Sequence, residues 1–243
     1  MPLREFRTAL RGATYRGDVP EIIRLLEEST WPEEVLQLVG GALLVALSSS
    51  SPECHDLAHR CVARLRDRAW DGDADLAEAM CARLGESPQP MLRPIPVDLA
   101  ELADVREGDP AHGGGRVDLR TGEVWPEMSF DDDLEDSDDE EDDDDEDRED
   151  SRWLWVDPVG SRPGYRDMEI FIDRLDDAHD AELLTVAISG PGAFRRFKQV
   201  LASRPEAADR WYAFSEDRTR GRARAWLAAQ GYTPAPRRAA PGH

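Results

Sequence analysis

The sequence has few cysteines, a single lysine and no long apolar run. Its three cysteines are an odd number, which argues against a disulfide framework and favours a reducing compartment, so we expect a cytoplasmic protein. The longest apolar stretch, residues 36–47, covers about a dozen residues, whereas a membrane-spanning helix needs about 20. The N-terminus also lacks the apolar core of a signal peptide. We therefore expect residues 36–47 to form a buried helix, and we expect no membrane partner.

Residues that commonly carry catalysis or bind metals are present but form no recognisable site. His55 and His59 lie four residues apart and are flanked by Cys54 and Cys61. On a helix, which turns about 100° per residue, the histidines and the cysteines would point about 120° apart and could not converge on one zinc ion. We expect two buried cysteines and two surface histidines instead. Gly113–Gly115 lacks the lysine and the following helix of a phosphate-binding loop. We therefore name no catalytic residue, metal ligand or cofactor.

Negative charge is distributed unevenly along the chain. The formal net charge is −22, and residues 131–150, called the acidic tract below, hold 17 acidic residues and one arginine. Leu134 is the one hydrophobic residue in this tract, so self-repulsion and conformational entropy predict a disordered loop, either regulatory or only solubilising. Residues 191–243 are basic, with a net charge of +7. This layout is typical of nucleic-acid contact or of charge pairing within the chain, although a solvated arginine-rich helix face also explains it.

The first 86 residues have the pattern of a bundle of short helices. Apolar residues recur at helical spacing, for example at Leu3, Phe6 and Leu10. Gly17 is placed to end the first helix, and Asp18 is placed to cap the next one. The predicted helices cover residues 3–15, a segment that begins at Asp18, and residues 32–47, 51–67 and 73–84.

Four prolines within residues 87–96 predict an extended linker, and we place the domain boundary there. A helix over residues 97–105 is expected next, followed by a hairpin whose loop contains Gly122, where a positive φ is easily adopted. The expected strands cover residues 116–119, 123–126 and 153–158. The acidic tract is therefore predicted to be an insertion between the second and the third strand.

The rest of the chain is predicted to be helical. The expected helices cover residues 164–175, 178–188, 193–201 and 205–230. The fold class is therefore α+β and mostly helical, with a helical domain over residues 1–86 and an α+β domain over residues 97–234. The second domain should contain a small antiparallel three-stranded sheet and four to five helices. Residues 235–243 are expected to form a disordered tail.

Basic residues near the C-terminus are the best candidates for contact with a partner. Phe194 and Phe197 would hold their helix against the core and leave a row of cations outward. The helix start that follows Gly190-Pro-Gly192 suits a phosphate or a carboxylate. In the last helix Arg222 and Trp226 are four residues apart, so the guanidinium could stack on the indole. Salt bridges to nearby acidic residues would explain the same cations without a partner. The candidate partner-binding residues are Arg195, Arg196, Lys198, Arg218, Arg222 and Trp226.

Several segments occur in a familiar order along the second half of the chain. They are Val117-Asp-Leu-Arg-Thr-Gly-Glu-Val124, residues 161–172, Gly192-Ala-Phe-Arg-Arg-Phe-Lys198, Trp211-Tyr-Ala-Phe214 and Arg224-Ala-Trp-Leu227. Together they resemble a bacterial family catalogued as uncharacterised protein family 0158, over about residues 97–234. The resemblance implies an intracellular bacterial protein with an α+β domain, and it implies no activity. The family is similar in having an acidic, variable stretch after the hairpin. Residues 1–85 lie outside the resemblance.

These observations predict a non-enzymatic cytosolic binding or interaction protein, whose partner is an unknown protein. The alternative is a nucleic-acid-associated protein whose acidic tract masks the basic helical face from polyanions. An enzyme without a recognisable motif is the third interpretation, and the lack of converging polar residues weighs against it.

Overall fold

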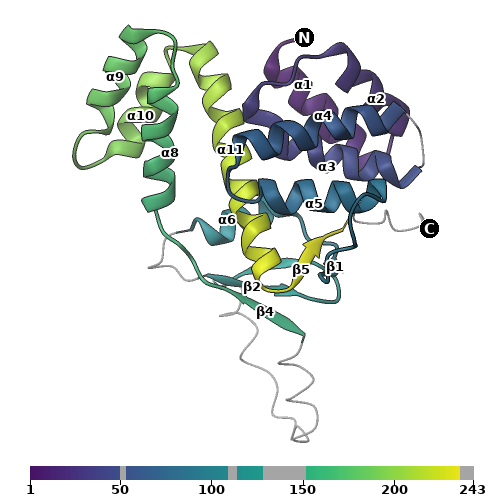
Figure 1. The fold of residues 1–243 in the computed structure, drawn as a ribbon. Coiled ribbons are helices and arrows are strands. Elements are labelled where there is room, and N and C mark those ends of the chain that lie inside the picture. Colours follow the sequence, from purple (N-terminus) through teal and green to yellow (C-terminus); the bar gives the residue numbers. More distant parts are fainter. Residues whose placement is uncertain (50–52, 109–113, 128–151, 236–243) are drawn as a thin grey trace, which may run out of the picture. The chain divides into compact units, whose positions relative to one another are not determined.

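The computed structural model describes residues 1–49, 53–108, 114–127 and 152–235. The predictions of a disordered acidic tract and of a disordered tail beyond residue 235 therefore lie outside the described residues. The described chain is mostly helical with small sheets (Figure 1), which confirms the expected α+β class. It divides into two compact units: unit 1 holds Met1–Met91 and Gly164–Ala225, and unit 2 holds Leu92–Pro163 and Trp226–His243. The separate folding of residues 1–86 and 97–234 stays a prediction.

Unit 1 begins with a helical bundle that agrees with the predicted one. Its α-helices are α1 (Leu3–Arg16), α2 (Val19–Glu28), α3 (Leu36–Ala46), α4 (Glu53–Arg68) and α5 (Asp73–Leu84). The boundary between α1 and α2 follows from local chemistry. Gly17 adopts the left-handed conformation after α1, and the Asp18 carboxylate accepts a hydrogen bond from the Glu21 amide at 3.3 Å. The predicted start of the third helix differs, because the residues after Pro32 first form a 3₁₀ helix, Glu33–Val35.

The later helices of unit 1 enclose an aromatic core. They are α8 (Arg162–Asp173), α9 (Ala178–Ile188), α10 (Ala193–Leu201) and α11 (Pro205–Ala229), of which α11 continues past the end of the unit at Ala225. The ring centroids of Phe197 and Trp211 are 4.7 Å apart, and those of Phe171 and Trp211 are 5.3 Å apart. Ala213 of α11 is buried in the core of the N-terminal bundle. Helix α11 therefore contributes to both hydrophobic cores of unit 1.

Unit 2 contains α6 (Leu99–Arg106) and the predicted sheet. Strand β2 (Gly115–Asp118) pairs antiparallel with β3 (Val124–Pro126) and with β4 (Trp153–Val156), in the order β3-β2-β4. Gly122 has a φ of 75°, as the hairpin prediction required. A Cβ atom at Gly122 would also lie 2.4 Å from the Pro96 carbonyl oxygen, so this turn needs glycine for conformation and for space.

A second, two-stranded sheet in unit 2 has no counterpart in the sequence predictions. Strand β1 (Arg93–Ile95) lies within the proline-rich segment and pairs in parallel with β5 (Tyr232–Pro234). Each strand has only three residues, which is too short to show an alternation of polar and apolar side chains. The pairing joins segments near opposite ends of the predicted second domain, and no local pattern reveals it.

Candidate functional site

The predicted basic residues of α10 reach the surface, but one of them has an intramolecular role. Arg195 and Lys198 are exposed. Arg196 folds back on the end of α9, where its guanidinium donates hydrogen bonds to the carbonyl oxygens of Ala187 at 2.9 Å and Ser189 at 2.6 Å. A helix C-terminus leaves carbonyl oxygens without helical partners. Arg196 therefore caps α9, and Arg195 and Lys198 are left facing solvent.

Arg218 and Arg222 of α11 both contact one buried carboxylate. The Arg218 Nε donates to Asp167 Oδ1 at 2.9 Å, and the Arg222 Nη2 lies 2.8 Å from Asp167 Oδ2. Asp167 belongs to α8, so the two arginines join α8 to α11. Trp226 belongs to unit 2, where the Arg106 guanidinium lies over its ring with Cζ 4.9 Å from the centroid.

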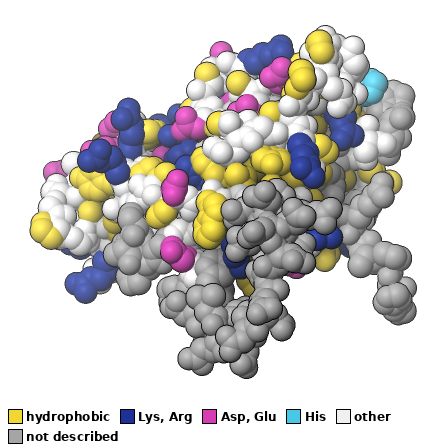
Figure 2. Space-filling model, turned by 90° about the horizontal axis from the view of Figure 1, so that it is seen from below, with side chains coloured by type: hydrophobic (Ala, Val, Ile, Leu, Met, Phe, Trp, Pro, Cys, Tyr) yellow, Lys and Arg dark blue, Asp and Glu magenta, His cyan; other side chains and the backbone are white. Residues whose placement is uncertain are grey.

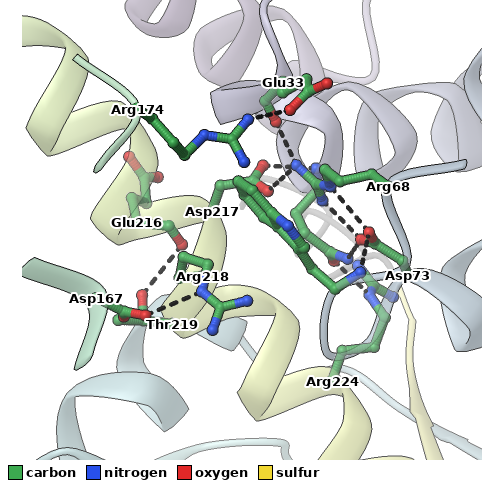
Figure 3. Close-up of polar contacts among 12 residues, drawn as sticks. Glu33, Arg68, Asp73, Asp167, Arg174, Glu216, Asp217, Arg218, Thr219 and Arg224 are labelled. Carbon is green, nitrogen blue, oxygen red and sulfur yellow. Dashed lines mark hydrogen bonds and ion pairs between the residues drawn. The ribbon is translucent and has the colours of Figure 1, made fainter. Parts of the chain in front are cut away.

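A buried charged cluster in unit 1 joins α4, α5 and α11 (Figure 3). Arg68 Nη2 lies 2.6 Å from Asp73 Oδ1, and Arg68 Nη1 lies 2.7 Å from Asp217 Oδ2. These three side chains are no more than 3% exposed. The backbone N–H of Gln37 donates to Asp217 Oδ1 at 2.7 Å, and the side-chain Nε2 of Gln37 donates to Asp73 Oδ1 at 2.9 Å. One arginine therefore holds two carboxylates, and Gln37 of α3 donates one hydrogen bond to each of them.

Burial changes the acidities of groups in this cluster. It raises the pKa of Asp217 to about 6, in spite of the opposing effect of Arg68. It lowers the pKa of Arg224, whose Nε donates to the Gln37 side-chain oxygen at 2.9 Å, to about 10. Shifted pKa values often mark catalytic groups, but a catalytic group must also be reachable by a substrate. Because these side chains are closed off from solvent, the cluster is better explained as internal support for α11.

A groove on the surface of unit 1 is the strongest candidate for binding a partner. It has a volume of about 450 Å³. Helix α1 provides most of its polar lining and α11 provides the rest. The lining residues are Arg4, Arg7, Thr8 and Arg11 from α1, and Asp209 and Tyr212 from α11. We call this feature the arginine groove.

Glu216 is the internal counter-charge of the arginine groove. Its carboxylate forms ion pairs with Arg7 and Arg11, and it lies 3.0 Å from the Nε of Arg220. Burial alone would raise the pKa of Glu216, but Arg220, Arg7 and Arg11 together hold that pKa below its usual value. The groove is therefore locally positive. The guanidinium groups of Arg4, Arg7, Arg11 and Arg220 outnumber the two carboxylates, which belong to Glu216 and Asp209.

The sequence does carry a signal for half of this groove. Arg4, Arg7 and Arg11 are separated by three and four residues, which places them along one face of a helix. Phe6 and Leu10 share that helix and are buried, so the arginine face borders the core face. The α11 half has no local signal, because its residues follow α1 by about two hundred positions. The residues predicted from sequence to bind a partner lie in the C-terminal basic segment and do not include the α1 arginines.

The part of the chain that the structure describes contains no group of three or more His, Cys, Asp or Glu side chains able to hold a metal ion. Cys54 and Cys61 are buried, and His55 and His59 are exposed, as predicted. The His59 Nε2 lies 2.6 Å from a carboxylate oxygen of Glu86. Burial raises the pKa of the Cys61 thiol to about 12, which suppresses its reactivity. Among the described helices, none combines the length and the apolar character needed to cross a membrane.

Comparisons with known proteins cover mainly the second half of the chain. A family model described as Uncharacterised protein family (UPF0158) matches residues 117–241. A UPF0158 protein from Pseudomonas aeruginosa is 27% identical over 152 residues, which represent 60% of this chain and 90% of the relative. No solved structure matches the chain. The family match confirms the resemblance found in the sequence, although it begins at residue 117 and not near residue 97.

Proposed function

Because this chain belongs to the UPF0158 family, which is uncharacterised, we propose its function from the geometry of its surface. We propose a non-enzymatic binding protein whose arginine groove receives a short acidic segment of a protein partner. A cytoplasmic location is part of the proposal, and it is supported by three free, buried cysteines, Cys54, Cys61 and Cys81.

The observation that carries the proposal is the gathering of three arginines from one face of α1 around a groove of about 450 Å³. A guanidinium presents a planar fork of donors that matches the two oxygens of a carboxylate. Tyr212 is exposed at the same groove and offers an aromatic ring together with a hydroxyl group. Arginine and tyrosine are both enriched among the residues that dominate binding energy at interfaces. The groove thus combines charge recognition with an apolar anchor.

The overall charge favours a short acidic segment over a long polyanion. The net charge of −22 repels an extended polyanion such as duplex DNA. At physiological ionic strength, charges more than about 8 Å apart are largely screened, so a short segment would respond mainly to the groove itself. A nucleic-acid-associated protein is the alternative, and the exposed cations Arg195 and Lys198 on α10 are the observation in its favour.

The proposal can be tested with the full chain and a labelled ten-residue oligoglutamate peptide, by fluorescence anisotropy at 50 and 200 mM salt. Arg4→Glu should weaken binding at least tenfold, because Arg4 lies in the groove and its side chain is exposed. Glu216→Gln should strengthen binding, because Arg7 and Arg11 lose their internal counter-charge. Arg83→Glu is the matched control: it makes the same charge change at an exposed position of α5 and should have little effect.

Two outcomes would contradict the proposal. One is an absence of peptide binding at 50 mM salt, and the other is an equal loss of affinity in Arg4→Glu and Arg83→Glu, which would indicate a response to net charge alone. A labelled 20-nucleotide single strand, tested in parallel, addresses the alternative. Binding of this strand that is lost on changing Arg195 and Lys198 to Ala, and not in Arg4→Glu, would favour nucleic-acid association through α10.

A further inference from the structure

The arginines of the arginine groove are not equally available to a partner. The Arg7 guanidinium donates to the Tyr212 carbonyl oxygen at 3.2 Å and forms an ion pair with Glu216, and the Arg7 side chain is 11% exposed. Arg11 also pairs with Glu216, but its side chain is 39% exposed. Arg4 is exposed, and within the described ranges its guanidinium forms no ion pair. Arg7 is therefore committed to holding α1 against α11, and Arg4 and Arg11 are the cations left for a ligand.

The α11 side of the groove carries a carboxylate without a counter-charge. Asp209 is partly buried there, yet among the residues that the structure describes its side chain takes part in no ion pair or hydrogen bond. Basic and acidic side chains at the surface commonly lie beside one another (Figure 2). Arg210, the next residue, behaves in this way, since it lies 3.5 Å from Glu34 and 3.4 Å from Asp176. Asp209 and Arg4 line one groove without pairing with each other, so each is open to a ligand.

An exposed aromatic ring accompanies Asp209 on α11. Tyr212 follows it by three residues, a spacing that makes two side chains neighbours on the surface of a helix. Tyr212 is 51% exposed and also lines the groove. A carboxylate attracts a cation through its charge, and the face of an aromatic ring attracts a cation through its quadrupole. Asp209 and Tyr212 therefore favour an ammonium or guanidinium group, whereas Arg4 and Arg11 favour a carboxylate.

We propose that Asp209 and Tyr212 form a cation subsite within the arginine groove, so that the acidic segment bound there carries a lysine or arginine close to its acidic residues. The inference rests on the proposed function and specifies the partner further. The groove, at about 450 Å³, has the size of a small-molecule site, so the basic residue must lie within a few residues of the acid that contacts Arg4. The subsite also sets specificity, because a uniformly acidic segment places negative charge against Asp209.

The test compares the binding of two labelled peptides to the full chain, by fluorescence anisotropy at 150 mM salt. Each peptide has ten residues, all glutamate except the fifth, which is lysine in one peptide and uncharged acetyl-lysine in the other. Attraction to the positive charge of the groove alone favours the acetylated peptide, because that peptide is the more negative of the two. The cation subsite reverses this order. The lysine peptide should bind about fivefold more tightly, as expected for one ion pair and one cation–π contact at a surface.

Three variants assign the preference to the subsite. Asp209→Asn should abolish the preference for lysine, because it removes the charge and keeps the shape of the side chain. Tyr212→Leu should reduce the preference, because it removes the ring and keeps an apolar side chain. Asp67→Asn is the matched control: it makes the same charge change at an exposed position of α4 and should keep the fivefold preference. Each variant is compared with itself on two peptides, so a general loss of affinity does not imitate a loss of preference.

Two results would overturn the inference. One is equal or tighter binding of the acetylated peptide by the unsubstituted protein, and the other is a lysine preference that persists in Asp209→Asn, which would place the cation elsewhere on the chain. In both cases the proposed function would stand if oligoglutamate still bound and Arg4→Glu still weakened that binding. If none of the peptides bound, both would fail. A lysine preference that is kept in Asp67→Asn and lost in Asp209→Asn would support the subsite.

Discussion

Gly221 in α11 lies against Gly72, the residue before α5, at a contact too close for any side chain. A Cβ atom at Gly72 would lie 2.2 Å from the Gly221 carbonyl oxygen, and one at Gly221 would lie 2.2 Å from the Asp71 carbonyl oxygen. The backbone of α11 therefore contacts the backbone of Asp71 and Gly72, just before α5, directly. Asp217 precedes Gly221 by about one helical turn and Asp73 follows Gly72, so the same approach brings both carboxylates to Arg68.

Gly221→Ala should destabilise unit 1 by about 3 kcal/mol or more, because the added methyl group has only rigid backbone to displace. The free energy of unfolding in urea measures the change. Gly41→Ala in α3 is the matched control, since a Cβ atom there would meet nothing within 4 Å. It should be neutral or stabilising by roughly 0.5–1 kcal/mol, as expected for alanine within a helix. Equal effects of the two substitutions would mean that the close approach does not exist in solution.

Arg68→Met should cost about 3–5 kcal/mol of unfolding free energy, because it leaves two buried carboxylates without their cation. Arg24→Met removes an arginine that pairs with Glu21 and Glu28 at the surface and should have little or no effect. Denaturant titration of both variants at neutral pH makes the comparison. A loss no larger in Arg68→Met than in Arg24→Met would show that the buried ion pairs of Arg68 do not stabilise the fold.

Glu216→Gln should lower the free energy of unfolding by about 2 kcal/mol at neutral pH, because it removes the partly buried carboxylate that pairs with Arg7 and Arg220. The folded-state pKa of Glu216 is lower than its usual value of 4.5, so its ionisation stabilises the fold above about pH 4.5. This contribution is lost as the pH falls through the folded-state pKa, where the protonated carboxyl resembles glutamine. The stability difference between the two proteins should therefore shrink in acid, as measured by denaturant unfolding at several pH values. A difference that is constant with pH would point to a steric cause.

Replacement of residues 131–150 by a short Gly/Ser linker should leave the thermal midpoint within about 5 °C of the unsubstituted value, a change of roughly 1 kcal/mol for a domain of this size. The reason is compositional, since Leu134 is the one hydrophobic residue that the tract could bury. Differential scanning calorimetry of the two proteins at matched salt gives the comparison. A larger fall in the midpoint would mean that the tract makes stabilising contacts with the folded chain.

The predictions from sequence succeeded where the cause is local. Gly17 and Asp18 mark a helix boundary because one can adopt a left-handed conformation and the other can cap free backbone amides. Gly122 marks the hairpin for a similar reason. Where the cause is a distant partner, the local pattern was insufficient. Phe194 was expected in the core and is 38% exposed, and the strand Arg93–Ile95 becomes a strand only by pairing with Tyr232–Pro234.

The candidate sites divide in the same way. The sequence by itself determined the arginine face of α1, because side-chain direction follows from helix geometry. Only the tertiary structure decided that Arg196 caps a helix and that Arg68 holds both Asp73 and Asp217. The sequence alone does not distinguish a charged side chain that is paired within the fold from one that is free. Whether it is free to bind a partner depends on which residues the fold brings within a few ångströms of it.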